Sequence, residues 1–218
     1  VRERAQALIE IAHPDDREQL IENAKKANLI YQDQIFLKDN AHLYPSEIAT
    51  EHVFRNGLKV RFRAIKPSDE DEMRHLFYRF SDEAVYYRYF TSIKTMPHTK
   101  MQEYVNIDYG QVMSIVGLIN EPGQGHIIAE ARYVKDPDKP WADVAFVVDE
   151  EFSGLGIATF LYKMLIRLAK ERGLKGFTAD VLSSNAAMMS VFEKGGIVKA
   201  KLEYGVYKLS MPFEETIL

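Results

Sequence analysis

A chain of 218 residues with 46% apolar side chains can bury one full hydrophobic core plus an appendage, as globular proteins do. Its 28 basic and 32 acidic residues give a net charge of −4, and the two signs are interspersed, which argues against nucleic-acid and anionic-membrane partners. The absence of cysteine excludes disulfides, thiolate metal sites and a cysteine nucleophile.

Other bulk features predict a soluble, metal-free protein. No apolar run is long enough to span a bilayer and no secretory signal is present, so we expect a cytoplasmic location. The six histidines are scattered without ligand spacing, so no metal site is expected. Because the chain begins at Val1 rather than methionine, we expect it to be a fragment of a longer polypeptide.

The first 56 residues predict a helical extension and a linker. Apolar residues recur at helical spacing over residues 2–27, with a break at His13-Pro14 that predicts two helices. Residues 29–56 show no sustained period and end in a predicted turn at Asn56-Gly57. We therefore divide the chain into an extension, 1–56, and a main domain, 57–218.

The main domain begins with a strand and two helices. Apolar residues alternate over residues 58–64, and helical spacing follows over residues 73–80, with Ser68 as the candidate N-cap. A weaker helix is expected at residues 97–107. Three apolar, β-rich runs then predict an antiparallel meander, with its first turn at Pro122-Gly123. These runs are residues 112–119, 127–134 and 141–148.

The second half of the domain returns to helical spacing. A period of 3.6 residues starts at Ile157 and stops at Gly173, which predicts a long core helix. The remaining pattern predicts a strand, a short helix and two closing strands. Their ranges are 177–182, 186–194, 197–201 and 204–211.

The most informative segment joins a strand to a helix through a glycine-rich turn, Gly154-Leu155-Gly156. The N–H groups that open a helix are unpaired and the helix dipole adds partial positive charge, so such a turn can bind a pyrophosphate without lysine. An ordinary helix start explains the pattern equally well. Two known phosphate motifs do not fit, because no lysine follows the glycines and Thr159 stands where a dinucleotide fingerprint needs glycine.

Two segments together resemble the GNAT superfamily of N-acetyltransferases. Residues 153–158, Ser-Gly-Leu-Gly-Ile-Ala, resemble its signature Arg/Gln-x-x-Gly-x-Gly/Ala, with Ser153 in place of the first residue. Residues 179–185, then Met188 and Phe192, resemble its strand, asparagine, short helix and aromatic residue. The resemblance implies an α+β (α/β) fold of the GNAT type. Its sheet would be mixed, mostly antiparallel and twisted, with about seven strands and helices on both faces.

Further segments resemble narrower families. Bacterial protein-lysine acetyltransferases are similar at residues 61–69, 86–90, 107–109 and 142–145. The C-terminus of acetyl-CoA hydrolase/CoA-transferase enzymes is similar to residues 3–30, which implies an upstream CoA-transferase domain in the same chain. The resemblance implies transfer of an acetyl group from acetyl-CoA to a primary amine, with a protein lysine as expected acceptor, by direct attack in a ternary complex.

The resemblance also implies an acetyl-CoA site on the fourth strand of the domain, the glycine turn and the second segment. A backbone N–H around Val147 or Val148 would stabilise the tetrahedral intermediate. Asn185 resembles the asparagine that contacts the cofactor in this family, but an ordinary helix N-cap explains an asparagine at this position equally well. The expected cofactor-binding residues are Phe146, Val147, Val148, Ser153, Gly154, Leu155, Gly156, Ile157, Ala158, Thr159, Asn185, Met188 and Phe192.

Catalysis requires a base, because a lysine of pKa about 10.4 is protonated at neutral pH and cannot attack a thioester. The candidates are Asp143, where the subfamily carries a glutamate, and Glu130. Each also fits an exposed strand carboxylate beside a cross-strand cation. The family's usual acid, a tyrosine, is Phe192 here, so water or Ser190 would replace it, or no acid is present.

Two interpretations stay open. Because Ser153 and Phe192 replace two functional residue types, a non-catalytic module that senses acyl-CoA is the alternative to an enzyme. The aromatic run at residues 86–90 either lines an acceptor groove or packs beside the core, and we favour core packing.

Overall fold

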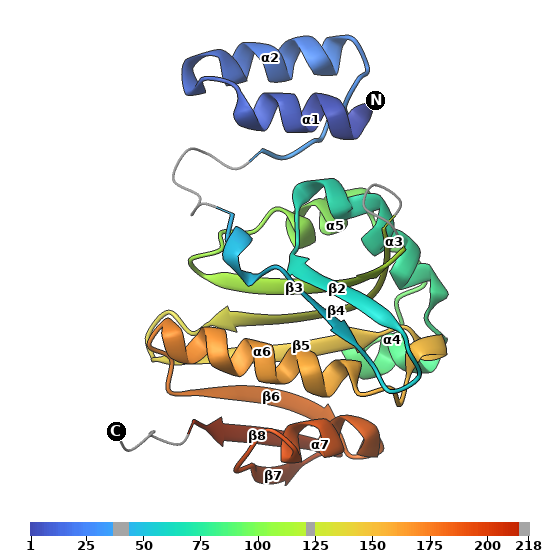
Figure 1. Cartoon of the computed structure of the whole chain (residues 1–218), viewed down its shortest axis with the longest axis vertical. Coiled ribbons are helices and arrows are strands. Elements are labelled where there is room, and N and C mark those ends of the chain that lie inside the picture. The colour runs from blue at the N-terminus through green and yellow to red at the C-terminus, as the bar shows by residue number, and fades with distance from the viewer. Residues whose placement is uncertain (37–43, 121–124, 214–218) are drawn as a thin grey trace.

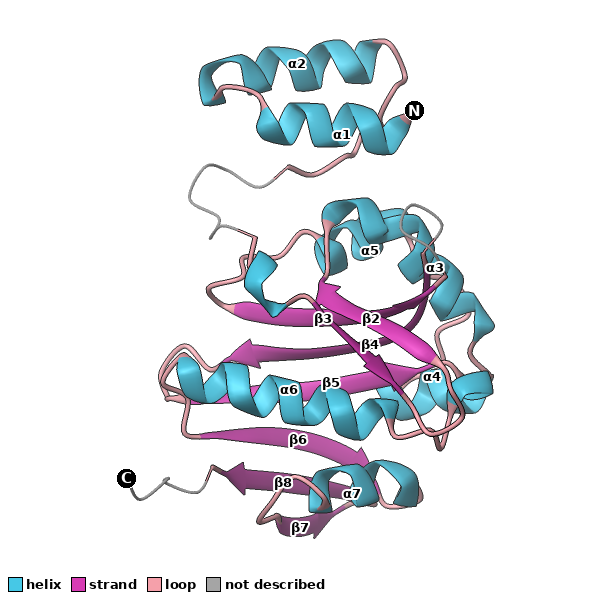
Figure 2. Cartoon of the chain, in the orientation of Figure 1, coloured by secondary structure: helices cyan, strands magenta, loops and turns pink. Residues whose placement is uncertain are grey.

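One eight-stranded sheet organises the chain in the computed structural model, which describes residues 1–36, 44–120 and 125–213. The strand order is β1-β2-β3-β4-β5-β6-β8-β7 (Figure 2). Among the described strands only β5 and β6 pair in parallel, and the other neighbours are antiparallel. The predicted mixed, mostly antiparallel sheet is confirmed, while the turn predicted at Pro122-Gly123 lies outside the described residues. The strands are β1 (Thr50–Val53), β2 (Lys59–Ala64), β3 (Val112–Ile119), β4 (His126–Lys135), β5 (Trp141–Val148), β6 (Gly176–Leu182), β7 (Lys199–Glu203) and β8 (Val206–Pro212).

Helices cover both faces of the sheet. On one face lie α3, α4 and α5, where the Tyr104 hydroxyl of α5 donates to Glu130 of β4. On the other face lie α6 and α7, where the rings of Tyr162 and Phe192 meet at 5.2 Å. The predicted long core helix is confirmed, and Gly173 follows its end with φ +77°. The helices are α1 (Arg2–Ile11), α2 (Pro14–Lys26), α3 (Glu70–Arg79), α4 (Asp82–Tyr89), α5 (His98–Val105), α6 (Ile157–Glu171) and α7 (Ala186–Glu193).

The strand β1 raises the count to eight, one more than the sequence predicts. It lies within residues 29–56, where we expected only a linker, and it pairs from Thr50 opposite Phe62 to Val53 opposite Lys59. All four β1 side chains are exposed. An edge strand of this kind has no alternation of buried and exposed residues, so the periodicity could not reveal it.

The start of α3 also differs from the prediction. A short 3-10 turn, Pro67–Asp69, precedes the helix, and the backbone N–H of Lys66 donates to Asp69 Oδ2 at 2.8 Å. The same carboxylate accepts two bonds from Arg63, at 2.6 and 2.7 Å. The N-cap prediction for Ser68 was therefore wrong, because Ser68 lies inside the 3-10 turn and Asp69 occupies the N-cap position of α3.

The two N-terminal helices form a hairpin at one end of the molecule, and β7 and β8 lie at the other end (Figure 1). The hairpin has a small core of its own, made by Ile9, Ala24 and Ile30. Polar contacts join it to the body, among them a bond from Gln34 Nε2 to Gln102 Oε1 of α5 at 2.8 Å. The predicted pair of helices is confirmed.

Candidate active site

A split in the sheet opens a large cavity. The parallel pairing of β5 and β6 extends only from Trp141 opposite Gly176 to Asp143 opposite Thr178. Because β5 continues to Val148, its later residues have no partner strand on the β6 side. A cavity of about 1000 Å³ occupies this opening.

The cavity brings together nearly all the residues that the sequence singled out. Its walls come from β5, from α4 on one face of the sheet, and from the glycine turn, α6 and α7 on the other face. Leu155 is not part of its lining; its side chain packs against the core. Glu130 does not line it either. The predicted residues that do line it are Asp143, Phe146, Val147, Val148, Ser153, Gly154, Gly156, Ile157, Ala158, Thr159, Asn185, Met188 and Phe192.

The side chains of β5 divide between the two faces. Val147 lies opposite Glu130 of β4, whose side chain faces α5. Cross-strand partners share a face and successive residues alternate, so Asp143 also points to the side of α4 and α5. Phe146 points to the opposite side, where its ring contacts Tyr162 at 5.6 Å. The cavity therefore has a half beside α4 and a half beside α6 and α7.

Backbone donors of β5 face the split. The N–H of Asp149 donates to Ile128 O of β4 at 2.8 Å. Because N–H groups along a strand alternate between its two sides, those of Phe146 and Val148 point toward β6 and the cavity. This direction favours Val148 over Val147 as the oxyanion donor that the resemblance implies.

The glycine turn exposes backbone at the start of α6. Gly154 and Gly156 have φ values of +75° and +91°, which favour glycine, and nothing lies within 4 Å of a Cβ built at either position. Gly156 is the N-cap residue, and no side chain caps the helix. The N–H groups of the first turn are thus available to an anion, and the helix dipole favours negative charge there.

Helix α7 supplies an apolar wall. Asn185 Oδ1 accepts from the N–H of Met188 at 3.0 Å, so the ordinary N-cap explanation is observed even though Asn185 also lines the cavity. Phe192 is 1% exposed and cannot donate a proton. Ser190 lines the cavity and is the hydroxyl on α7 that could do so.

Asp143 is open to the cavity and has a perturbed acidity. Thr178 Oγ1 donates to its Oδ1 at 3.3 Å. Partial desolvation raises the pKa of Asp143 above the ordinary carboxyl value. The hydrogen bond from Thr178 lowers this pKa by less, and the still smaller effects are those of Asp180, which raises it, and of Arg88 and Lys208, which lower it. A raised pKa makes this carboxylate a stronger base than an ordinary aspartate.

Glu130 has a different environment. It is fully buried, and its Oε1 accepts from Ser114 Oγ and Arg132 Nε, both at 2.6 Å. Its Oε2 accepts from the Tyr104 hydroxyl at 2.8 Å. The expectation of an exposed strand carboxylate was wrong for this residue, and its acceptor sites are already occupied by the protein.

The aromatic run on α4 divides between two roles. Tyr87, Arg88 and Phe90 line the cavity, whereas Tyr89 packs against Phe77 with ring centroids 6.0 Å apart. The core packing that we favoured therefore holds for part of the run only. Helical spacing alone does not show which side of a short helix faces a cavity.

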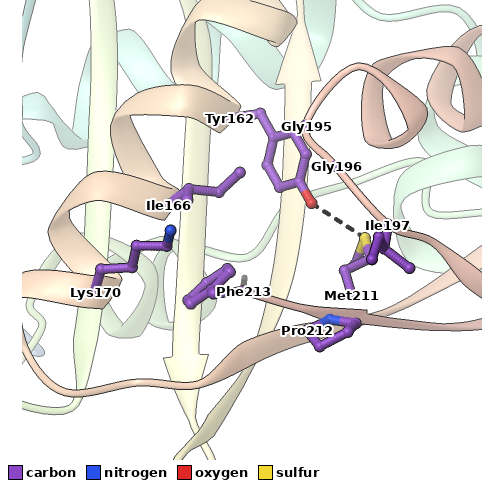
Figure 3. Close-up of a pocket in the computed structure, with 9 residues that line it drawn as sticks. All are labelled: Tyr162, Ile166, Lys170, Gly195, Gly196, Ile197, Met211, Pro212 and Phe213. Atoms are coloured by element: carbon purple, nitrogen blue, oxygen red, sulfur yellow. Dashed lines mark hydrogen bonds between the residues drawn. The ribbon is translucent and has the colours of Figure 1, made fainter. Parts of the chain in front are cut away.

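A smaller cavity of about 90 Å³ lies beside β8 (Figure 3). The Tyr162 hydroxyl is directed into it and donates to Met211 Sδ at 3.2 Å (Figure 3). Burial raises the pKa of Tyr162 to about 12, so its phenol stays protonated. Because this hydroxyl faces Met211 rather than the larger cavity, Tyr162 does not replace the acid missing at Phe192.

Neither a metal-binding cluster nor a membrane-spanning helix is found in the described part of the chain. No group of three or more histidine, aspartate or glutamate side chains there could hold a metal ion. No helix there is both long and apolar enough to cross a membrane.

Comparison with known proteins relates this geometry to an enzyme family. The family model described as the acetyltransferase (GNAT) family matches residues 70–197. Acetyltransferase Pat of Mycolicibacterium smegmatis is 31% identical over 153 residues, which cover 70% of this chain and 45% of Pat. The chain thus spans less than half the length of that relative.

Solved structures agree with the sequence match. The GNAT domain of PAT from S. lividans superposes with a TM-score of 0.71 at 28% identity, over 78% of this chain and 100% of that domain. A cAMP-binding acyltransferase from Mycobacterium smegmatis gives a TM-score of 0.54 at 25% identity, over 78% of this chain and 49% of that protein. The fold is therefore the GNAT fold, and the chain belongs to the GNAT family of acetyltransferases.

Proposed function

We propose that this chain transfers an acetyl group from acetyl-CoA to a primary amine, with a protein lysine as the acceptor. One observation carries the proposal: a single cavity passes through the split between β5 and β6. It joins the glycine turn on one face of the sheet to Asp143 on the other. A donor and an acceptor that enter from opposite faces would meet in this opening.

The residues present fit acetyl-CoA, which supplies the activated thioester. The first turn of α6, from Gly156 to Thr159, would hold the pyrophosphate through backbone N–H groups. The free edge of β5 would bind the pantetheine arm as an added strand, with donors at Phe146 and Val148. Met188 and Phe192 would pack against the apolar part of the arm.

Asp143 would accept the proton that the amine loses as its nitrogen attacks the thioester carbonyl. The side chain lies in the half of the cavity beside α4, opposite the glycine turn, where an amine would approach. The departing thiolate would receive a proton from water or from Ser190, because Phe192 has none to give. Attack would be direct, in a ternary complex, because the chain has no cysteine and both substrates would enter the same cavity.

A transfer assay with paired binding measurements tests the proposal. The protein is incubated with acetyl-CoA and a panel of amines and lysine-containing proteins, and thiol release and acetylated product are scored. Isothermal calorimetry with CoA measures binding separately. The proposal predicts CoA binding and an acetylated amine, and it fails if no protein or small amine is acetylated.

The second candidate function, a module that senses acyl-CoA, is favoured by Ser153 and Phe192. Neither residue supplies the side-chain function that stands at its position in the family signature. A sensor would bind CoA without transferring an acetyl group to any amine. Asp143→Ala would then leave CoA binding unchanged, and no transfer activity would be present for the substitution to remove. Residues 1–56 are further predicted to be the tail of an upstream acetyl-CoA hydrolase/CoA-transferase domain. The predicted location of the protein is cytoplasmic.

A further inference from the structure

Arg88 is a partly buried cation that the proposed function leaves unused. It comes from α4 and lines the cavity. Its Nη2 donates to the Tyr104 hydroxyl at 3.1 Å, while its Nε is buried and bonds to nothing in the part of the chain that the structure describes. A partly desolvated cation that makes no direct ion pair is costly, and it favours the binding of an anion.

Behind Arg88 two cations share one carboxylate, and on the cavity side the carboxylate that acts on Arg88 is Asp143, the proposed base. Two guanidinium groups, Arg88 and Arg132, surround the single carboxylate of Glu130. Arg132 Nε donates directly to Oε1 of that carboxylate at 2.6 Å. Arg88 is connected to it through the Tyr104 hydroxyl, which accepts from Arg88 and donates to Glu130. Desolvation lowers the pKa of Arg88, but Tyr104 and Glu130 raise it by more, so the guanidinium keeps its proton.

The position of Arg88 indicates which substrate would meet it. Helix α4 lies on the face of the sheet toward which Asp143 points, and Tyr87 and Phe90 line the same half of the cavity. The glycine turn, where the pyrophosphate would bind, opens on the opposite face. Arg88 therefore belongs to the half of the cavity that the acceptor would occupy.

We propose that Arg88 forms a carboxylate subsite, so that the preferred amine acceptor carries a carboxylate near its amino group. This inference rests on the proposed function. A guanidinium presents two parallel N–H donors that match a carboxylate, and such charge-assisted bonds are stronger than neutral ones. An amino acid would supply the group directly. In a protein substrate, an acidic side chain or the chain terminus beside the target lysine would supply it.

The test compares acids with their amides. Acceptors are the ω-amino acids from β-alanine to 6-aminohexanoate and the corresponding ω-amino amides, each with acetyl-CoA. At one or more chain lengths the acid should exceed its amide in kcat/KM by about tenfold or more, the size of a charge-assisted hydrogen bond. In Arg88→Gln this acid-to-amide ratio should fall to about one, and Arg88→Lys should retain part of it.

The matched control is Arg167→Gln, which removes one arginine from the exposed side of α6. It should leave both the rates and the acid-to-amide ratio unchanged. Circular dichroism and CoA affinity show whether each variant is folded. Equal rates for acids and amides at every length, in the folded wild-type protein, would overturn the subsite.

Two further arms separate the remaining outcomes. In the first, a carboxylate-free amine is tested with succinyl-CoA and with acetyl-CoA. If it reacts faster with succinyl-CoA and Arg88→Gln removes that difference, Arg88 binds a carboxylate on the acyl group, and the assignment of the subsite to the acceptor is overturned.

The second applies if no amine is acetylated, in which case the proposed function fails on its own. Calorimetric titration of the CoA-loaded protein with the same acids and amides then tests whether the carboxylate subsite exists. Binding of an acid, but not its amide, that depends on Arg88 supports it; equal or absent binding overturns it.

Discussion

Asp143 and Glu130 lie on the same face of the sheet, but only Asp143 reaches the cavity. Asp143→Asn should therefore lower kcat by about 10²- to 10⁴-fold, the usual contribution of a general base, because an amide cannot accept the proton. CoA affinity should not change. Asp143→Glu, which keeps the carboxylate on a longer side chain, should retain part of the rate. Full activity of the Asn variant would contradict the assignment.

The raised pKa of Asp143 predicts a pH profile. In kcat/KM against pH, activity should fall as pH drops through this raised pKa, at a higher pH than an ordinary aspartate would give. The folded state holds this proton more tightly than the unfolded state does, so the associated stability is present at low pH and is lost as pH rises through the folded pKa. Asp143→Asn should thus be at least as stable as the parent protein at pH 7.5 in urea.

Glu130→Gln should lower the free energy of unfolding and should have no direct effect on acetyl transfer. It removes the charge that compensates Arg132, and breaking a buried ion pair costs about 3–5 kcal/mol. Urea unfolding measures the loss. The control Glu171→Gln, at an exposed pair with Arg167 of 4.0 Å, should change stability by less than about 1 kcal/mol. A Glu130 variant of unchanged stability and lost activity would make Glu130 the base.

At the scale of elements, the two ends of α6 offer a matched experiment on the glycine turn. Gly156 and Gly173 have φ values of +91° and +77°, and a Cβ at either would meet nothing within 4 Å. Alanine at each position should cost about 1–2 kcal/mol through the left-handed backbone alone. Only Gly156 lines the cavity, so Gly156→Ala should also weaken CoA binding by about tenfold, measured by calorimetry. An equal loss of CoA affinity in Gly173→Ala would remove the turn as the pyrophosphate site.

Two of the elements that the sequence predicted have a regular pattern of burial. The alternation in β2 and the 3.6-residue period in α6 each bury one face, and both elements appear close to the expected bounds. By contrast, β1 buries no side chain, so nothing in its composition marks it as a strand. The wrong N-cap at Ser68 has a different cause, because a 3-10 turn at Pro67–Asp69 moves the N-cap position of α3 to Asp69.

At the scale of the molecule, the cavity depends on contacts that periodicity does not encode. The glycine turn and Asn185 could be predicted because each is a local signal in the sequence. The separation of β5 from β6 could not, because it depends on where pairing between two distant strands stops. For the same reason the sequence did not show that Glu130, the second candidate base, is buried away from the cavity, or that Arg88 of α4 lines it.

The attachment of the N-terminal hairpin gives a prediction for the whole chain. Gln102 of α5 is fully buried, and its Oε1 accepts from Gln34 Nε2 at 2.8 Å and from the N–H of Ile35 at 3.1 Å. Its Nε2 donates to Glu70. Gln102→Met keeps the volume but leaves these groups without partners, which should cost about 1–3 kcal/mol for each buried group left unsatisfied.

Hydrogen exchange should locate that loss. In Gln102→Met, amides of residues 1–36 should exchange faster, while those of α6 should keep their protection, because the hairpin has only a small core of its own. Gln111→Met, an exposed position at the start of β3, is the control and should change neither region. If α6 loses protection together with the hairpin, the two regions unfold as one unit. The polar contacts of Gln102 then belong to the common core rather than to a separable attachment.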